Sequence, residues 1–126
     1  MQLLLVGSPQ DSHFSFEVLT EENGHAAYNL AFGLEDKQDY NQAIEWYWKA
    51  IGIDSTQVYA YSALGRLYNK MNRSVEALLI LNQAKKKFPD SDYAYLIYKN
   101  LGNAYLFQGM NDLALKYLEL SREIIK

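Results

Sequence analysis

Residues 58–91 read VYAYSALGRLYNKMNRSVEALLILNQAKKKFPDS, and the spacing of side chains in this stretch predicts the fold. Large and small residues recur at the offsets of a 34-residue helix–turn–helix unit. The residues at these offsets are Tyr61, Leu64, Gly65, Tyr68, Ala77, Leu81, Ala84 and Pro89. Because proline has no amide hydrogen to donate, Pro89 ends a helix. The stretch is therefore expected to form two helices packed against each other.

A similar unit lies on either side of this stretch. Ala43, Ala77 and Ala114 each stand near the start of a second helix, and they are separated by 34 and then 37 residues. The period is therefore 34 with one insertion of three residues. The units cover residues 24–57, 58–91 and 95–126. We expect the insertion at residues 92–94 to lengthen the first helix of the third unit by about one turn.

The aligned small residues have a mechanical role. Two antiparallel helices approach to about 8–10 Å when one side of the contact is small and larger neighbours fill the grooves beside it. Gly65 aligns with Ala31 and Gly102. In the second unit we expect Gly65 and Ala84 to allow the approach, with the remaining space filled by Leu64, Tyr68 and Leu81. Local signals agree with this division, because capping residues stand near each expected second-helix start. They are Asp39 or Asn41, Asn72 or Ser74, and Asn111 or Asp112.

The pattern resembles the tetratricopeptide repeat, and the resemblance covers residues 24–126. The second and third units carry the family's spacing as Tyr61-Leu64-Gly65-Tyr68 and Tyr98-Leu101-Gly102-Tyr105. The first unit departs from it at Ala27, Leu34 and Ser55. The resemblance implies an all-α superhelix of three stacked helix–turn–helix repeats. It also implies a concave groove, lined by the first helix of each unit, that takes a peptide or a partner helix.

Side chains on the first helices that lie outside the core register are the expected ligand contacts. The candidate groove residues are Tyr28, Phe32, Tyr59, Ser62, Arg66, Asn69, Lys99, Asn100 and Asn103. The aromatic members suit an apolar anchor, since aromatic side chains supply much of the energy of protein interfaces. The basic and amide members suit an acidic group or backbone carbonyls. The expected partner is therefore a protein or peptide with both features.

Two other roles for the chain are compatible with the sequence. Apolar residues of the last helix have no later repeat to cover them, which makes self-association a candidate function. The candidate oligomer surface is Leu113, Leu120, Ile124 and Ile125. The chain also has the size and acidity of small three-repeat secretion chaperones. A third role is not expected. Repeats that clamp the carboxylate of heat-shock chaperones use Lys, Asn and Arg at five groove positions, and only the last of these keeps a comparable polarity here. The five positions hold Tyr28, Phe32, Ala63, Leu96 and Asn100.

Residues 1–23 do not fit a repeat. Phe14, Phe16 and Val18 alternate with polar residues, and Leu3 begins a second short apolar run, which together predict a β-hairpin or extended segment. A lone hairpin is marginal in water, so it needs a surface to lie on. Trp46 and Trp48 are the candidate docking site, and the basic groove is an alternative for this acidic segment. Disorder of the terminus is a third reading.

Composition excludes several classes of function. The 126 residues contain no Cys, which rules out disulfides and thiolate metal sites, and the net charge of −3 argues against non-specific nucleic-acid binding. The two histidines, His13 and His25, lack metal-site spacing, and no glycine-rich phosphate loop is present. We therefore expect no catalysis, no metal and no cofactor. No apolar run approaches a membrane span, so a cytoplasmic protein is expected.

Overall fold

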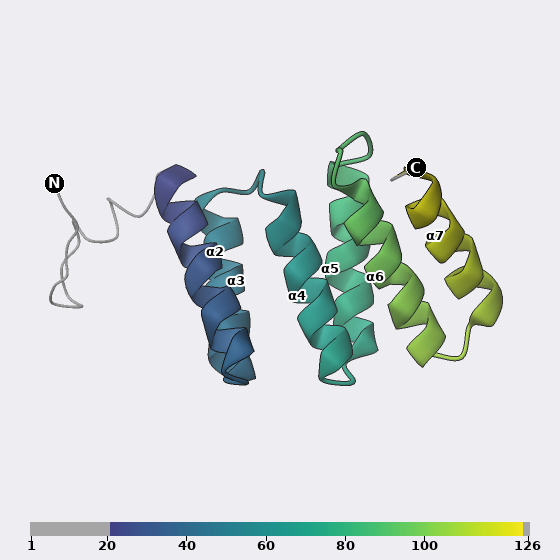
Figure 1. Cartoon of the computed structure of the whole chain (residues 1–126), viewed down its shortest axis with the longest axis horizontal. Helices are drawn as coiled ribbons and strands as arrows, with labels where there is room; N and C mark the ends of the chain where they lie inside the picture. Colours follow the sequence, from purple (N-terminus) through teal and green to yellow (C-terminus); the bar gives the residue numbers. More distant parts are fainter. Residues whose placement is uncertain (1–20, 125–126) are drawn as a thin grey trace, which may run out of the picture. The chain divides into compact units, whose positions relative to one another are not determined.

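The computed structural model describes residues 21–124, and every regular element in that range is an α-helix (Figure 1). The helices are α2 (Glu21–Asp36), α3 (Tyr40–Ile53), α4 (Val58–Lys70), α5 (Ser74–Lys87), α6 (Ala94–Phe107) and α7 (Asn111–Ile124). The predicted all-α fold of paired helices is confirmed. The predicted N-terminal hairpin falls on residues 1–20, which lie outside the described range, and residues 21–23 belong to α2.

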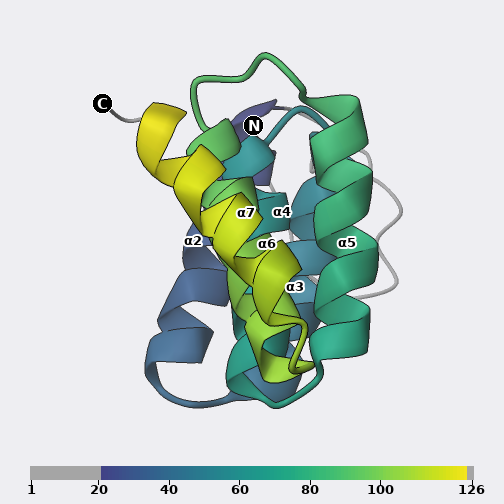
Figure 2. The same ribbon diagram turned by 90° about the vertical axis from the view of Figure 1, so that its right-hand side faces the viewer.

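The helices fall into two compact units that divide between Gln57 and Val58. The first unit contains the α2–α3 hairpin. In the second unit, α6 packs against α4, α5 and α7, so two hairpins are joined side by side through α6 (Figure 2). Each of the three predicted repeats is therefore a helical hairpin.

The turns inside the three hairpins share one geometry. At corresponding positions Gln38, Asn72 and Gly109 have positive φ values of 65°, 62° and 76°. The amide of the next residue then donates to a carbonyl five residues earlier, at 2.9 Å, 2.8 Å and 2.9 Å in the three units. This is the Schellman arrangement, which satisfies carbonyls left unpaired at a helix end. The repeat is thus visible in the backbone as well as in the sequence.

The predicted N-cap position is confirmed at the start of α3 and is wrong at the start of α5. Asp39 is the N-cap of α3, but its side chain makes no capping hydrogen bond, and the N-cap of α5 is Arg73 instead of Ser74 or Asn72. A left-handed residue next to each N-cap already closes the turn through the backbone, so these helix starts do not depend on side-chain caps.

The prediction that the three inserted residues lengthen a helix by one turn is wrong. Helix α6 begins at Ala94, and the preceding residues form turns. The hydroxyl of Ser91 accepts a hydrogen bond from the Tyr93 amide at 3.0 Å, and the Ser91 carbonyl accepts one from the Ala94 amide at 3.1 Å. Ser91 therefore fixes a turn at this point, and the insertion lengthens the α5–α6 connection.

The predicted small-to-large contacts are present in both hairpins of the second unit. A Cβ added to Gly65 would lie 2.4 Å from Leu81 Cδ2, and one added to Gly102 would lie 2.7 Å from Leu118 Cγ. Gly65 and Leu81 are buried. Only glycine therefore allows the second helix to approach this closely.

The first unit solves the same packing problem with different residues. Tyr47 stands at the position of Leu81 and is fully buried, and its hydroxyl donates to Glu35 Oε1 at 2.7 Å. Leu30 is 45% exposed, although its counterparts Leu64 and Leu101 are fully buried. The first unit therefore leaves one side of α2 open to solvent.

Candidate functional site: the exposed strips of the first helices

Helix α4 is buried along almost its whole surface. The residues that retain solvent access are Tyr59, Arg66 and Lys70, spaced by seven and four residues. At 3.6 residues per turn this spacing places all three on one face of the helix. We call these three residues the α4 strip. Because the rest of α4 is core, any ligand that contacts this helix must contact the strip.

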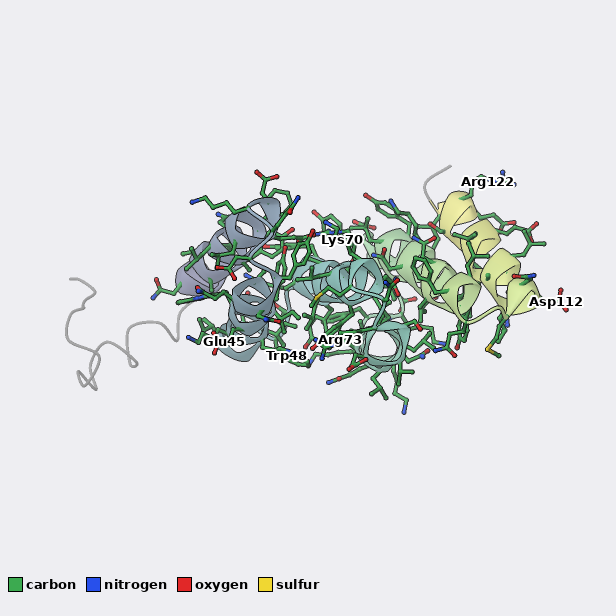
Figure 3. All side chains as sticks on the ribbon, turned by 90° about the horizontal axis from the view of Figure 1, so that it is seen from below. Glu45, Trp48, Lys70, Arg73, Asp112 and Arg122 are labelled. Atoms are coloured by element: carbon green, nitrogen blue, oxygen red, sulfur yellow. The ribbon has the colours of Figure 1, made fainter. Side chains whose placement is uncertain are left out.

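The α4 strip is aromatic at one end and basic at the other. The ring of Tyr59 meets the ring of Tyr93 edge to face, with centroids 6.1 Å apart, and Tyr93 is 49% exposed. Arg66 and Lys70 follow toward the end of α4, where Lys70 projects from the helix (Figure 3). This arrangement offers an aromatic platform and two cations along one helix.

Helix α6 carries the corresponding strip, and α6 packs against α4 within the same unit. Leu96 and Asn103 are half-buried at the positions that match Tyr59 and Arg66. Lys99, another predicted groove residue, is exposed on α6. Tyr59, Arg66, Lys99 and Asn103 therefore have the solvent access that a ligand contact needs.

Three other predicted groove residues are buried between the helices. Ser62, Asn69 and Asn100 are each at most 5% exposed. The Asn100 amide donates to the hydroxyl of Ser62 at 3.0 Å and to its carbonyl at 3.3 Å, and the Asn69 amide donates to the Asn100 carbonyl at 3.1 Å. This chain of hydrogen bonds ties α4 to α6 and fixes their register.

In the first unit the structure brings the two predicted aromatic residues together. The rings of Tyr28 and Phe32 stack with centroids 6.5 Å apart, and Tyr28 also contacts the buried Tyr47 ring at 5.7 Å. Phe32 is 52% exposed. The pair is therefore an accessible aromatic patch anchored to the core of its unit.

The predicted oligomer residues share a stripe with Tyr117 on α7. Leu113 is half-buried, and Leu120 and Ile124 are exposed, while Ile125 lies outside the described residues. The ring of Tyr117 stacks with Tyr98 and Tyr105 of α6 at 5.9 Å and 5.7 Å. Its hydroxyl accepts a hydrogen bond from Lys85 of α5 at 2.9 Å. Tyr117 therefore faces neighbouring helices of its own unit, whereas Leu120 and Ile124 stay accessible to solvent.

A second stripe on α7 was missed by sequence reasoning. Leu115, Leu118, Glu119 and Arg122 line an open hollow of about 250 Å³. Leu115 is 58% exposed. These four residues stand at positions i, i+3, i+4 and i+7, which is the pattern of one helical face and was available in the sequence. Asp112 and Arg122 mark opposite ends of α7 in Figure 3.

The tryptophans predicted to receive the N-terminal segment differ in exposure. Trp48 is 43% exposed, and Trp46 is half-buried with the Lys49 ammonium 4.2 Å from its ring centroid. The segment itself lies outside the described residues, so its docking stays a prediction.

Comparison with protein families agrees with the geometry. A family model described as TPR repeat matches residues 35–72, a window that contains α3, α4 and the turn after them. The chain contains a tetratricopeptide repeat. Beyond the matched window, a helical hairpin with the same turn geometry recurs as α6 and α7, at residues 94–124. No curated protein matches the sequence.

The tetratricopeptide repeat supports a general role as a protein-interaction scaffold. None of the helices in residues 21–124 is both long enough and apolar enough to cross a membrane. In the same part of the chain, no three acidic, His or Cys side chains are grouped as metal ligands would be.

Proposed function

We propose that this tetratricopeptide-repeat protein binds an extended peptide along the exposed strips of α4 and α6, with no chemistry performed on it. The observation that supports this most strongly is the burial of α4, which leaves Tyr59, Arg66 and Lys70 as its solvent-accessible residues. Tyr and Arg are the side chains most enriched among residues that dominate interface energies.

The ligand is a peptide with an apolar or aromatic side chain followed by an acidic one. The Tyr59–Tyr93 pair takes the apolar anchor, because two rings meeting edge to face provide a preformed aromatic corner. Arg66 and Lys70 take the carboxylate, since a guanidinium binds it with two parallel hydrogen bonds. Asn103 of α6 hydrogen-bonds the peptide backbone between them.

The Tyr28–Phe32 patch of the first unit is a second candidate anchor site with the same aromatic chemistry. A peptide that uses the second unit alone needs only the α4 and α6 contacts. The two sites are therefore separable by mutation.

A displayed library of random twelve-residue peptides tests the proposal. Selection against the full-length protein should enrich peptides that pair an aromatic or branched aliphatic residue with Asp or Glu. Fluorescence anisotropy with a selected peptide should then show affinity lowered at least tenfold by Arg66→Glu or Tyr59→Ala, which corresponds to about 1.4 kcal/mol. Affinity should also fall with added salt.

The matched control is Lys86→Glu, which makes the same charge change on an exposed position of α5. This variant should bind the selected peptide as the wild type does. Failure to enrich any peptide would refute the proposal, and so would equal losses in Arg66→Glu and Lys86→Glu.

A further inference from the structure

The side of α2 that is open to solvent has a buried counterpart in the second unit. The exposed residues on this side are Ala26, Asn29, Leu30 and Gly33, which we call the open face of α2. In the register of the repeats they correspond to Ile97, Asn100, Leu101 and Ala104 of α6, all of which are buried. The same four positions are thus exposed in one repeat and covered in another.

The buried face of α6 shows what the open face of α2 would pack against. Helix α6 lies against α4 and α5, and Asn100 at its centre bonds to Ser62 and Asn69 of α4. The side chains on the open face of α2 are small or apolar, and a Cβ added to Gly33 would meet nothing within 4 Å. The face is therefore shaped for close approach by a helical hairpin.

Helices α6 and α7 offer the hairpin surface that this face fits. The residues that correspond to Ser62 and Asn69 are Lys99 and Leu106, and both are exposed. On α7, the hollow lined by Leu115, Leu118, Glu119 and Arg122 corresponds to Leu78, Leu81, Asn82 and Lys85 of α5. Lys85 bonds to Tyr117 of the following hairpin. The α6–α7 surface therefore continues in register an interface that already exists within the chain.

The two parts of the chain that hold these surfaces differ in net charge, although residues 92–126, which carry the α6–α7 surface, hold four acidic and four basic side chains. Residues 21–57 hold seven acidic and two basic side chains, whereas residues 58–126 hold six acidic and ten basic ones. Opposite net charges steer association and suppress like-with-like pairing.

We propose that copies of this chain associate head to tail, with the open face of α2 of one copy packed on the α6–α7 surface of the next. The register places Asn29 opposite Lys99, whose ammonium donates to the Asn29 amide oxygen. It also places Trp46, the counterpart of Tyr117, beside Arg122, where a guanidinium stacks on the indole ring. This interface differs from the stripe of Leu113, Leu120 and Ile124 suggested by the sequence.

Sedimentation velocity on the full-length protein over a concentration series is the test. The wild type should grow in mass with concentration. Gly33→Arg should block one surface and Leu106→Arg the other, so that each variant alone keeps the 14.5 kDa of one chain at every concentration. Both positions are exposed, so circular dichroism should show unchanged helicity. The two variants mixed in equal amounts should form a dimer and nothing larger, because each retains the surface that the other lacks.

Two controls carry the same substitution outside the interface. Asn41→Arg lies at the start of α3, and Phe107→Arg lies beside Leu106, at the position of the exposed Lys70. Both should associate as the wild type does, and at least tenfold more tightly than either blocked variant. A wild type that stays monomeric at all concentrations would overturn the proposal. Slow amide hydrogen exchange at residues 26–33 in such a monomer would assign the open face to another segment of the same chain. Association unaffected by Gly33→Arg, or a mixture that stays monomeric, would also overturn it.

Discussion

Replacing Gly65 by Ala is the change for which the structure gives the sharpest expectation. The added methyl group would lie 2.4, 2.5 and 2.8 Å from the Cδ2, Cγ and Cδ1 atoms of Leu81. Carbon atoms in contact normally stay about 3.5–4.0 Å apart. Leu81 is fully buried, so its side chain has no free space into which it can turn. The α4–α5 hairpin must therefore open or Leu81 must leave its rotamer.

The cost follows from two opposing effects. Overpacking of a core costs about 1–3 kcal/mol. Alanine favours a helix over glycine by roughly 1 kcal/mol, which offsets part of that cost. Because the contact is as close as 2.4 Å, we place the overpacking cost at about 2–3 kcal/mol and expect a net loss of about 1–2 kcal/mol in the free energy of unfolding in urea. In a domain of this size the melting temperature should fall by roughly 3–8 °C.

Gly33→Ala is the matched control, because a Cβ at Gly33 meets no atom within 4 Å. It should stabilise the protein by about 0.5–1 kcal/mol. A second test combines Gly65→Ala with Leu81→Ala, which removes the clashing atoms. Leu81→Ala alone should cost about 2–5 kcal/mol, and adding Gly65→Ala to it should cost nothing further. If Gly65→Ala is as stabilising as Gly33→Ala, the close contact between α4 and α5 does not exist.

Three further predictions concern other parts of the fold. Tyr47→Phe removes the donor to the buried Glu35 carboxylate and should lower the free energy of unfolding by about 1–3 kcal/mol in urea titrations; an unchanged midpoint would contradict the hydrogen bond. Gly109→Ala forces a side chain into a left-handed turn at φ 76° and should cost about 1 kcal/mol in a thermal melt, whereas the same change at an unstrained glycine should not. Hydrogen bonds from Thr56 to the Asp54 carboxyl lower the pKa of that group from its ordinary value of 3.8. The ionised carboxylate therefore stabilises the folded protein at pH values above its pKa in the unfolded chain, and this contribution is lost as the pH falls through its pKa in the folded protein. Thr56→Val should reduce the acid sensitivity of the urea midpoint between pH 5 and pH 2.5, and identical pH profiles would refute this linkage.

The sequence was sufficient for the parts of the fold that depend on repetition. The alignment of Gly65 with Gly102 located the small positions of both hairpins in the second unit, and the structure shows that each faces a leucine of the second helix. Helix number and pairing follow from the same register. The family match at residues 35–72 covers only part of this pattern.

The sequence was less informative about which polar residues face a ligand. Ser62, Asn69 and Asn100 occupy positions on the first helices that suit groove contacts, yet they bond to one another between α4 and α6. Periodicity identifies the side of a helix, but it does not distinguish solvent from a neighbouring helix of the next repeat. The separation of 38 residues between Ser62 and Asn100 puts this pairing beyond any local pattern.

Connections also lay beyond sequence reasoning. The insertion before α6 could lengthen either a helix or a loop, and the hydrogen bonds of Ser91 decide in favour of the loop. The open face of α2 is invisible in the pattern, because Leu30 looks identical to its buried counterparts Leu64 and Leu101.

Nuclear Overhauser effects between side chains give the most direct test of the packing on which the whole account depends. We predict strong signals from the Gly65 α-protons to the Leu81 methyls, from Gly102 to the Leu118 methyls, and from the Asn100 side-chain amide to Ser62. The Gly33 α-protons of the monomer should give no signal to another helix. Absence of the Gly65–Leu81 and Asn100–Ser62 signals in the folded protein would contradict the paired hairpins and the registered α4–α6 contact.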